Sequence, residues 1–301
     1  MILATDIGYS FTKYAYVDNG VYVMNKIPTA LARIGTAFNN IGESELYEYN
    51  GQQYNVGEKA FDSPLSIPTR TNDFLTTYSP LFLAKIIADR KIIPDTICVS
   101  LSIAEYKNKK QELKKTCEYF IINKKEYRQD VLVLAQGLGI WANAGKPKNA
   151  LIVDIGYNTV DVLVIKDGVP SAEYSSGYTN KGTCIIASEL SDRIKKDFNG
   201  KTLSDFEIND VLQTGVFMLN RKSYNMSDTI NAAKKSYSKT ILDMVLNDIK
   251  IKNIAERTNN LILAGGGALF IDEYIKEQYG IEIPDNPEYA NVNGFLKLAQ
   301  G

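Results

Sequence analysis

The sequence predicts an α/β protein built as two similar lobes, each with a mixed sheet that helices cover. The stretch DIGYSFTKYAYVDNGV begins at Asp6, and the similar stretch DIGYNTVDVLVIKDGV begins at Asp154. In each half, strand-like segments precede an alternation of strand and helix, an order typical of mixed sheets with helices on their faces. Such folds bind ligands at the carboxyl ends of their strands, so we expect a site between the two halves.

Short apolar or alternating runs that end in glycine, asparagine or proline predict the strands. In the first half we expect strands at residues 2–7, 11–17, 21–26, 46–49, 53–56, 96–101, 119–122 and 131–134. In the second half we expect strands at residues 151–155, 160–165, 171–174 and 260–263. The rest of 28–80 is expected to be rich in loops.

Apolar residues at three- and four-residue spacing predict the helices. One is expected from about residue 79, because Pro80 suits a first helical turn. The others are expected at about 104–118, 137–143, 183–198, 205–255, 268–279 and 288–299. The linker is Gly145-Lys146-Pro147-Lys148. This linker predicts two lobes, at residues 1–146 and 147–301. The first lobe is expected to contain an insertion subdomain at about 28–79, and the second a helical subdomain at about 199–256. The final helix is able to pack back on the first lobe.

Composition excludes several classes of function. The chain of 301 residues has 34 basic and 35 acidic side chains, a net charge of −1, so no global field attracts nucleic acid or a membrane. It contains no histidine, which excludes Ser-His-Asp and Cys-His catalysis and histidine-ligated zinc. Three cysteines without metal-like spacing fit a reducing compartment. With no secretory pattern or apolar run long enough to span a membrane, we expect a cytoplasmic protein.

Residues 6–13 and 154–161 each predict a strand, a tight turn at glycine and a returning strand. Successive N–H groups in such a turn can form a nest for phosphate oxygens. Asp6 and Asp154 end their strands, where a carboxylate can hold Mg²⁺ through water, and Lys13 is placed to reach the same phosphates. The alternative for each stretch is an ordinary surface hairpin with a solvated or turn-capping aspartate.

Three further features have both a functional and a structural interpretation. Gln136 ends an apolar strand, where its amide could orient a water or simply cap the strand. The three glycines 265–267 separate a buried strand from a helix, so a base or phosphate could approach the backbone, or the glycines could serve packing alone. The lysines of 104–118 could bind a partner or be solvated.

These motifs occur in the order that marks the actin-like ATPases, and the sequence resembles that superfamily. Within it, the sequence resembles the bacterial ParM (StbA-like) plasmid-segregation proteins and their archaeal actin-like relatives. The stretches 49–60 and 286–295 carry the resemblance to this branch. The chain has Ser100-Leu101-Ser102 where ParM-like proteins often have Gly-Leu-Pro, and some of them have Glu in place of Gln136, which leaves filament geometry open.

The resemblance implies an actin-like (ribonuclease H-like, duplicated) fold with two lobes around a nucleotide cleft. It implies that ATP, or GTP, binds there with Mg²⁺, that Asp6 and Asp154 organise the metal, and that Gln136 positions the attacking water. The residues implied to bind the nucleotide are Gly8, Tyr9, Ser10, Phe11, Thr12, Lys13, Gly156, Tyr157, Asn158, Thr159, Lys181, Gly182, Gly265, Gly266 and Gly267.

The resemblance further implies an ATPase that polymerises head to tail into filaments for plasmid or DNA segregation. The implied partners are other copies of the chain and a DNA-binding adaptor, with no direct contact to nucleic acid or membrane. The alternative is a small-molecule kinase of the sugar or acetate type, which shares this kind of cleft. A kinase needs a general-base carboxylate, and no additional aspartate motif between residues 60 and 150 suggests one.

Overall fold

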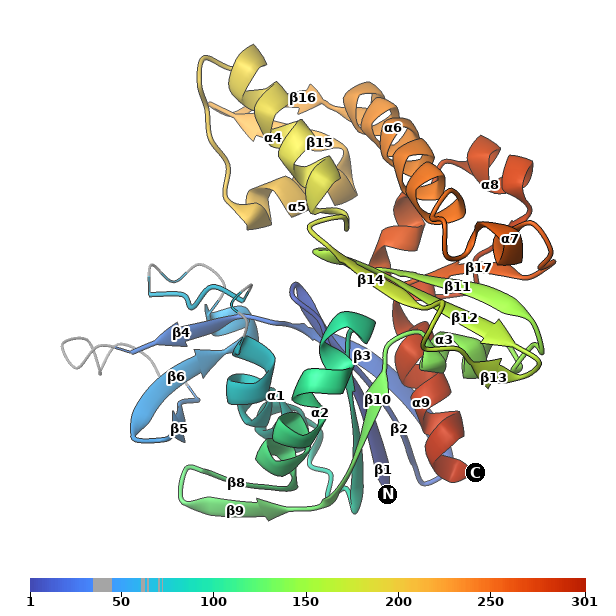
Figure 1. Ribbon diagram of the computed structural model, residues 1–301. Helices are drawn as coiled ribbons and strands as arrows, with labels where there is room; N and C mark the ends of the chain where they lie inside the picture. The colour runs from blue at the N-terminus through green and yellow to red at the C-terminus, as the bar shows by residue number, and fades with distance from the viewer. Residues whose placement is uncertain (35–44, 61–62, 64, 70, 72) are drawn as a thin grey trace. The chain divides into compact units, whose positions relative to one another are not determined.

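The structure, a computed structural model, describes residues 1–34, 45–60, 63, 65–69, 71 and 73–301 (Figure 1). Internal contacts divide the chain into two units. Unit 1 comprises Met1–Lys146 and Glu288–Gly301, and unit 2 comprises Pro147–Pro287. The expected insertion subdomain at about 28–79 lies partly outside the described residues.

Unit 1 is organised around a five-stranded sheet with the order β10-β7-β1-β2-β3. The strands are β1 (Ile2–Ile7), β2 (Phe11–Asp18), β3 (Val21–Pro28), β7 (Thr96–Leu101) and β10 (Asp130–Ala135). The meander β1-β2-β3 is antiparallel, whereas β7 runs parallel to both β1 and β10. The carboxyl ends of β1, β7 and β10 therefore lie at the same edge of the sheet.

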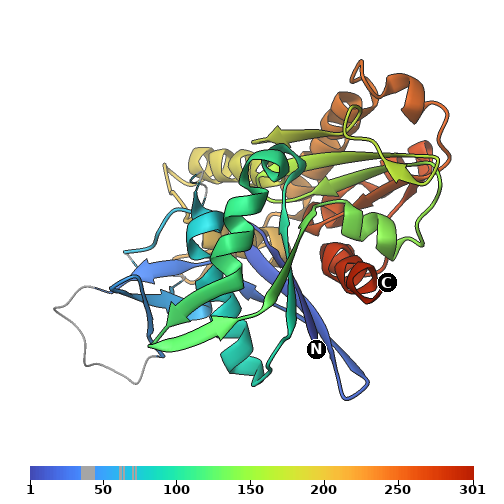
Figure 2. The same ribbon diagram turned by 60° about the horizontal axis from the view of Figure 1, so that its bottom comes forward.

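Helices cover both faces of this sheet. The helices of unit 1 are α1 (Phe74–Arg90), α2 (Ile103–Glu118), α3 (Leu138–Asn143) and α9 (Ala290–Gln300). Large side chains of the sheet, such as Leu3 and Ile97, join the core that contains α1 and α2. Small residues on the other face, Ala4, Ala15 and Cys98, pack against α9, which lies beside α3 in both views (Figures 1 and 2). Short side chains allow that helix to approach the sheet closely.

Two small sheets complete unit 1. One has the order β4-β6-β5, and the other is a hairpin of β8 and β9. Their bounds are β4 (Leu31–Arg33), β5 (Tyr47–Tyr49), β6 (Gln52–Val56), β8 (Tyr119–Ile122) and β9 (Lys125–Arg128). The sequence predicted β5, β6 and β8 but missed β4 and β9, which are short and carry exposed charges.

Unit 2 repeats the plan of unit 1 around a second sheet with the order β13-β12-β11-β17-β18, in which β14 also pairs with β12. The strands are β11 (Ala150–Ile155), β12 (Thr159–Lys166), β13 (Val169–Pro170), β14 (Ser176–Thr179), β17 (Leu261–Ala264) and β18 (Ile281–Glu282). Strand β11 pairs antiparallel with β12 and parallel with β17, just as β1 pairs antiparallel with β2 and parallel with β7. The duplication predicted from the sequence repeat is therefore confirmed in the topology.

The remaining elements of unit 2 cover this sheet or extend from it. They are α4 (Cys184–Asp197), α5 (Asp205–Thr214), β15 (Val216–Leu219), β16 (Lys222–Asn225), α6 (Ser227–Leu246), α7 (Lys252–Ala255) and α8 (Glu273–Tyr279). The core combines residues of β11 and β12 with the apolar stripes of α4 and α6. The stripe of α6 was expected from the three- and four-residue spacing of apolar residues in the sequence.

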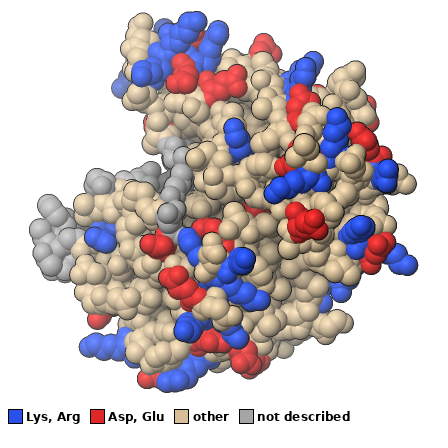
Figure 3. Space-filling model, viewed as in Figure 1, with Lys and Arg blue, Asp and Glu red and all other residues tan. Residues whose placement is uncertain are grey.

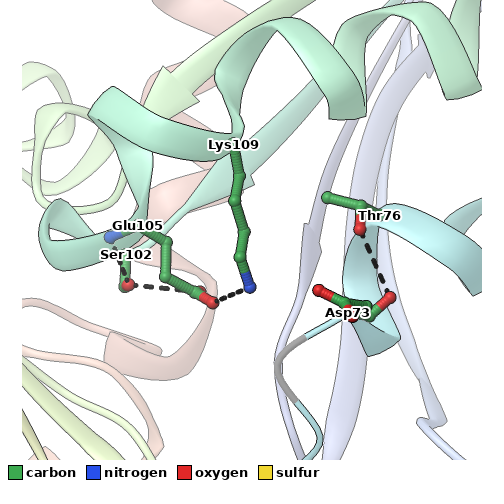
Figure 4. A network of polar contacts seen from close by, with 5 residues as sticks. All are labelled: Asp73, Thr76, Ser102, Glu105 and Lys109. Atoms are coloured by element: carbon green, nitrogen blue, oxygen red, sulfur yellow. Dashed lines mark hydrogen bonds and ion pairs between the residues drawn. The ribbon is translucent and has the colours of Figure 1, made fainter.

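The start of α1 was wrongly predicted. The helix begins at Phe74, and Pro80 lies inside it rather than in its first turn. Phe74 and Thr76 are both buried, so packing of these residues extends the helix toward its N-terminus despite the proline. At this N-terminus the hydroxyl of Thr76 donates to the carbonyl of Asp73 at 3.3 Å (Figure 4).

The second half also differs from the prediction: the short strands β13, β14 and β18 were not expected, and three expected elements take another form. Residues 171–175 form a turn in place of the expected strand, because the hydroxyl of Ser175 donates to the carbonyl of Ser171 at 2.6 Å. The expected helical region at 205–255 is interrupted by the β15-β16 hairpin, whose turn places Asn220 and Arg221 at positive φ. The expected helix at 268–279 is a 3-10 helix, Gly266–Phe270, followed by α8.

Charged side chains of both signs are interspersed on the face shown in Figure 3, as the net charge of −1 leads one to expect. Basic side chains gather where α4 ends, with Lys195 and Lys196 in its last turn. Among the described residues, no helix has the length and hydropathy needed to cross a membrane.

Candidate functional site

The first candidate half-site is the hairpin of residues 6–13 in unit 1, called here the first hairpin. Its turn is closed by Gly8, whose N–H donates to the carbonyl of Phe11 at 3.1 Å. A Cβ at Gly8 would lie 3.1 Å from that carbonyl oxygen and 3.4 Å from the Nζ of Lys13. The ammonium of Lys13 therefore lies over the turn, beside its backbone, where it adds positive charge to any anion site that the turn forms.

The other side chains of the first hairpin have different surroundings. The Thr12 hydroxyl is fully buried and pairs with the Thr29 hydroxyl at 2.9 Å, so it supports the hairpin from inside. The Ser10 carbonyl accepts the Thr29 N–H, and the Tyr9 carbonyl accepts the Thr69 hydroxyl. These bonds hold Tyr9 and Ser10 by their backbones, which fixes the shape of the turn.

Asp6 and Gln136 are brought together in unit 1. Asp6 is only 4% exposed, and its Oδ1 accepts a hydrogen bond from the Nε2 of Gln136 at 2.8 Å and from the Oγ of Ser100 at 2.7 Å. The three residues lie at the carboxyl ends of β1, β10 and β7, which the sheet order makes neighbours. Among the described residues both donors reach Oδ1, so Oδ2 remains for a cation.

The residues of the stretch Ser100-Leu101-Ser102, which lies near Asp6 and Gln136, each make a different contact. Ser100 binds Asp6, and the Leu101 carbonyl accepts the N–H of Gln136 at 2.8 Å. Ser102 is the N-cap of α2, where its Oγ accepts the N–H of Glu105, whose carboxylate in turn pairs with Lys109 at 2.7 Å (Figure 4). The sequence signalled this stretch only as a departure from the ParM-like pattern.

The second candidate half-site is the hairpin of residues 154–161 in unit 2, called here the second hairpin. The Gly156 N–H donates to the Thr159 carbonyl at 2.9 Å, so the turn has the same closure as the first hairpin. The Thr159 hydroxyl lies 3.4 Å from the position of a Cβ on Gly156. A hydroxyl thus covers this turn where an ammonium covers the first one.

The N-terminal end of α4 packs directly on the second hairpin. A Cβ on Gly182 would lie 2.4 Å from the carbonyl oxygens of both Gly156 and Tyr157, so no larger residue fits. The N–H groups of Thr183 and Cys184 donate to these two carbonyls at 3.1 and 2.8 Å. The start of the helix thereby fixes the hairpin backbone.

Lys181 and Asn158 extend this contact between the helix and the second hairpin. The N–H of Lys181 donates to the carbonyl of Asn158 at 3.2 Å, and the Lys181 carbonyl accepts the hydroxyl of Tyr237 at 3.0 Å. Burial raises the pKa of the Tyr237 phenol, so it stays a donor. The side-chain Oδ1 of Asn158 is buried and has no hydrogen-bond partner among the described residues.

The glycine turn, residues 265–267, lies against Asp154 and the second hairpin. A Cβ on Gly265, which has φ of +81°, would lie 2.4 Å from the Oδ1 of Asp154. A Cβ on Gly267 would lie 2.2 Å from the side chain of Ile155. Gly266 has open space at the equivalent position. The turn therefore brings bare backbone beside the Asp154 carboxylate, with room above Gly266.

Asp6 and Asp154 are each a single carboxylate of the kind that Mg²⁺ can bind together with water and phosphate. Across the parts of the chain that the structure describes, no group of three or more His, Cys, Asp or Glu side chains could hold a metal alone. Mg²⁺ needs no such cage, because it keeps several waters and takes one or two carboxylates together with substrate phosphates. Each unit supplies one aspartate of this kind beside a glycine hairpin.

The structure thus gathers the predicted site residues into two groups. Asp6, Lys13, Gln136 and the first turn are together in unit 1, and Asp154, the second turn, Gly182 and the glycine turn are together in unit 2. Sequence reasoning missed Ser100 as a partner of Asp6. The signal was its place at the end of a strand, which becomes informative only when the sheet order is known.

Solved structures share this fold over nearly the whole chain. The archaeal actin homologue Ta0583 aligns with TM-scores of 0.80 (native) and 0.79 (complex with ADP), at 19% and 18% identity, covering 99% of both chains. A 15-stranded ParM filament from Clostridium botulinum gives 0.75 at 19% identity, covering 99% of this chain and 98% of that one. Bacillus thuringiensis ParM with ATP gives 0.66 at 18% identity, covering 98% of both. The chain has the actin-like fold.

Family models agree with this fold class in each half of the chain. The model for the "Actin like proteins N terminal domain" matches residues 4–139, and the model for the "Archaeal actin homologue MreB-like, C-terminal" matches residues 152–277. The chain therefore belongs to the actin-like proteins. No curated protein sequence matches the chain significantly.

Proposed function

We propose that this actin-like protein binds and hydrolyses ATP with the residues of its two hairpins and polymerises into filaments. The observation that carries the proposal is the duplicated glycine hairpin, each copy beside a buried aspartate, with Gln136 bonded to the aspartate of the first. Support comes from the relatives of the same fold described with ADP or ATP and as a filament.

In this proposal the backbone of Gly8 to Phe11 and of Gly156 to Thr159 holds the phosphates, while the N–H groups of Gly8 and Gly156 themselves close the two turns. Lys13 adds a positive charge beside the first turn, and Thr12 braces that turn through Thr29. The backbone of 265–267, with open space at Gly266, receives the adenosine, and Lys181 and Gly182 border the ribose. GTP remains an alternative to ATP, because none of these contacts distinguishes the two bases.

The chemistry requires positioning and charge neutralisation more than covalent catalysis. Asp6 and Asp154 would hold Mg²⁺ through water, and the ion would neutralise developing charge on the phosphates. Gln136 is held by Asp6 through its Nε2, which leaves its side-chain carbonyl oxygen to accept a hydrogen bond from a water. That water is the proposed nucleophile, oriented by an uncharged group. A chain without histidine can perform this reaction.

The proposed biological role is segregation of plasmid or other DNA in the cytoplasm. The net charge of −1 argues against direct binding of the filament to DNA, so a DNA-binding adaptor is the proposed partner. Head-to-tail contacts between copies that do not close into a ring produce filaments.

The test is right-angle light scattering and sedimentation after addition of ATP with Mg²⁺, together with phosphate release. We expect scattering to rise with ATP, to remain at baseline with EDTA, and to fall as ATP is consumed. ADP and GTP in parallel reactions define the nucleotide preference. Absence of nucleotide binding would overturn the proposal. Absence of polymer, combined with phosphorylation of a sugar or acetate, would establish the kinase alternative instead.

A further inference from the structure

The C-terminal segment Glu288–Gly301 completes unit 1 on the face of the sheet opposite α1 and α2. Its helix α9 packs on β1, β2 and β7 through Val292, Phe295 and Leu296. The start of the segment is held by Glu288, which pairs with Lys26 at 2.7 Å. The Lys26 ammonium also lies 4.8 Å from the ring centre of Phe11 in the first hairpin. The segment is therefore anchored beside the first half-site.

Helices α9 and α3 touch backbone to backbone. A Cβ on Gly294 would lie 1.7 Å from the carbonyl oxygen of Gly139, and a Cβ on Gly139 would lie 2.2 Å from the carbonyl oxygen of Asn291. Neither glycine can be enlarged without moving one helix off the other. The position of α3, which begins two residues after Gln136, is thus set by α9.

Asn291 makes a specific contact at the start of α3. Its side chain is 3% exposed, and its Oδ1 accepts the N–H of Gly137 at 3.0 Å. Gly137 has φ of +87°, a backbone conformation that places the peptide after Gln136 at a sharp bend. The N–H of Gln136 itself donates to Leu101. The two consecutive N–H groups around the Gln136 side chain are therefore both held by fixed acceptors.

We propose that Asn291 is a positioning residue for Gln136, acting through the Gly137 N–H to aim the Gln136 amide at Asp6 and at the attacking water. This inference rests on the proposed ATPase function. Because the Oδ1 of Asn291 accepts the N–H of the residue that follows Gln136, we expect its loss to affect the rate of hydrolysis more than the affinity for ATP. It thereby makes the C-terminal helix part of the apparatus for hydrolysis.

The test replaces Asn291 by Leu, which is similar in size but has no acceptor, and by Asp, which keeps an Oδ1 acceptor. We expect Asn291→Leu to lower kcat on the order of tenfold, the loss typical of one hydrogen bond left unmade, with KM changed less than twofold. Asn291→Asp should recover most of the rate. Asn293→Ala is the matched control on the same helix, because Asn293 bonds to Tyr22 away from α3.

A double-mutant cycle separates positioning from general support of the fold. If Asn291 acts through Gln136, Asn291→Leu should cause no further loss of kcat in a Gln136→Ala background. Equal losses in both backgrounds, or a wild-type kcat in Asn291→Leu, would overturn the inference. Should Asn291→Leu fail to fold, as judged by thermal unfolding, Asn291→Ser removes the Oδ1 contact with less steric demand and enters the same cycle.

A readout independent of ATP distinguishes the failure of this inference from failure of the proposed function. Hydrogen exchange of the Gly137 amide should be faster in Asn291→Leu than in Asn291→Asp or the wild type. A wild-type chain that hydrolyses no ATP would overturn the proposed function. Unchanged protection of Gly137 in the Leu variant would overturn the role of Asn291 regardless of that outcome.

Discussion

Gln136 donates a hydrogen bond to Asp6 across the end of β7, so an amide and a carboxylate from two strands that are not adjacent form a pair. Ser100, on the strand between them, donates to the same oxygen. The amide orientation of Gln136 is thereby determined, with its nitrogen toward Asp6. The carbonyl oxygen of that amide is consequently the group that can accept a hydrogen bond from water.

Replacing Gln136 with Ala should lower ATP hydrolysis while leaving ATP binding nearly intact. The amide orients a water and contributes nothing to phosphate contacts in the proposed function, so its loss affects the transition state more than the ground state. We expect a decrease in phosphate release of about 10²-fold or more, with Kd for ATP within about threefold. Single-turnover phosphate release and ATP titration measure the two quantities. A large loss of affinity with an unchanged rate would contradict the assigned role.

Replacing Asp154 with Ala should abolish Mg²⁺-dependent hydrolysis while the protein remains folded. Asp154 ends a fully buried strand and lies against Gly265, so its removal leaves room for solvent without exposing the core. Circular dichroism and phosphate release across a Mg²⁺ titration give the readout. Asp228→Ala, an exposed aspartate in the first turn of α6, is the control. Unchanged hydrolysis in the Asp154 variant would exclude this residue from the metal site.

Replacing Gly182 with Ala should destabilise unit 2 and weaken nucleotide binding. The new methyl group would overlap two carbonyl oxygens of the second hairpin, both of which are backbone and cannot move independently. We expect a loss of unfolding free energy of about 1–3 kcal/mol, typical of overpacking. Gly266→Ala is the matched control, since Gly266 has open space and should keep wild-type stability. Urea denaturation compares them, and equal stability of both variants would contradict the contact.

Stability of unit 2 should depend on pH through the capping box of α5. The backbone N–H of Ser204 binds the Glu207 carboxylate and lowers its pKa below the ordinary value, while the Ser204 hydroxyl accepts the Glu207 N–H. A carboxyl with a depressed folded-state pKa contributes stability above its unfolded pKa and loses it as pH falls through the folded value.

Glu207→Gln should therefore be less stable than wild type near pH 7, and the difference should shrink below about pH 4. Ser204→Ala should cost about 1 kcal/mol at neutral pH by removing the helix cap. Urea denaturation at pH 7 and pH 3.5 tests both expectations. A Glu207→Gln deficit that grows as the pH falls would show that the carboxylate is not stabilised by the cap.

The sequence was sufficient to predict the two hairpins because each is local: strand, glycine turn and returning strand follow one another within about a dozen residues. Gln136 could be predicted as a candidate site residue for the same reason, because it ends an apolar strand. Its hydrogen bond to Asp6 could not be predicted from spacing, because it depends on β7 lying between β1 and β10. Parallel strand order is decided by packing of distant segments.

The errors in the second half have a related cause. The apolar stripe of α6 was recognised, but the same spacing was extended over the β15-β16 hairpin, where Gly215 ends α5 and Asn220 turns the chain. Both residues are turn signals that could have been read. The contact of Asn291 with Gly137 had no such signal, because it joins residues more than 150 positions apart.

The discontinuity of unit 1 affects how the chain acquires its structure during synthesis. Pro147–Pro287 is contiguous, so it can fold as soon as it leaves the ribosome. The sheet of Met1–Lys146 must wait with Ala4, Ala15 and Cys98 uncovered until α9 emerges. Gln136 therefore acquires the support that Asn291 gives through Gly137 only after α9 has been synthesised.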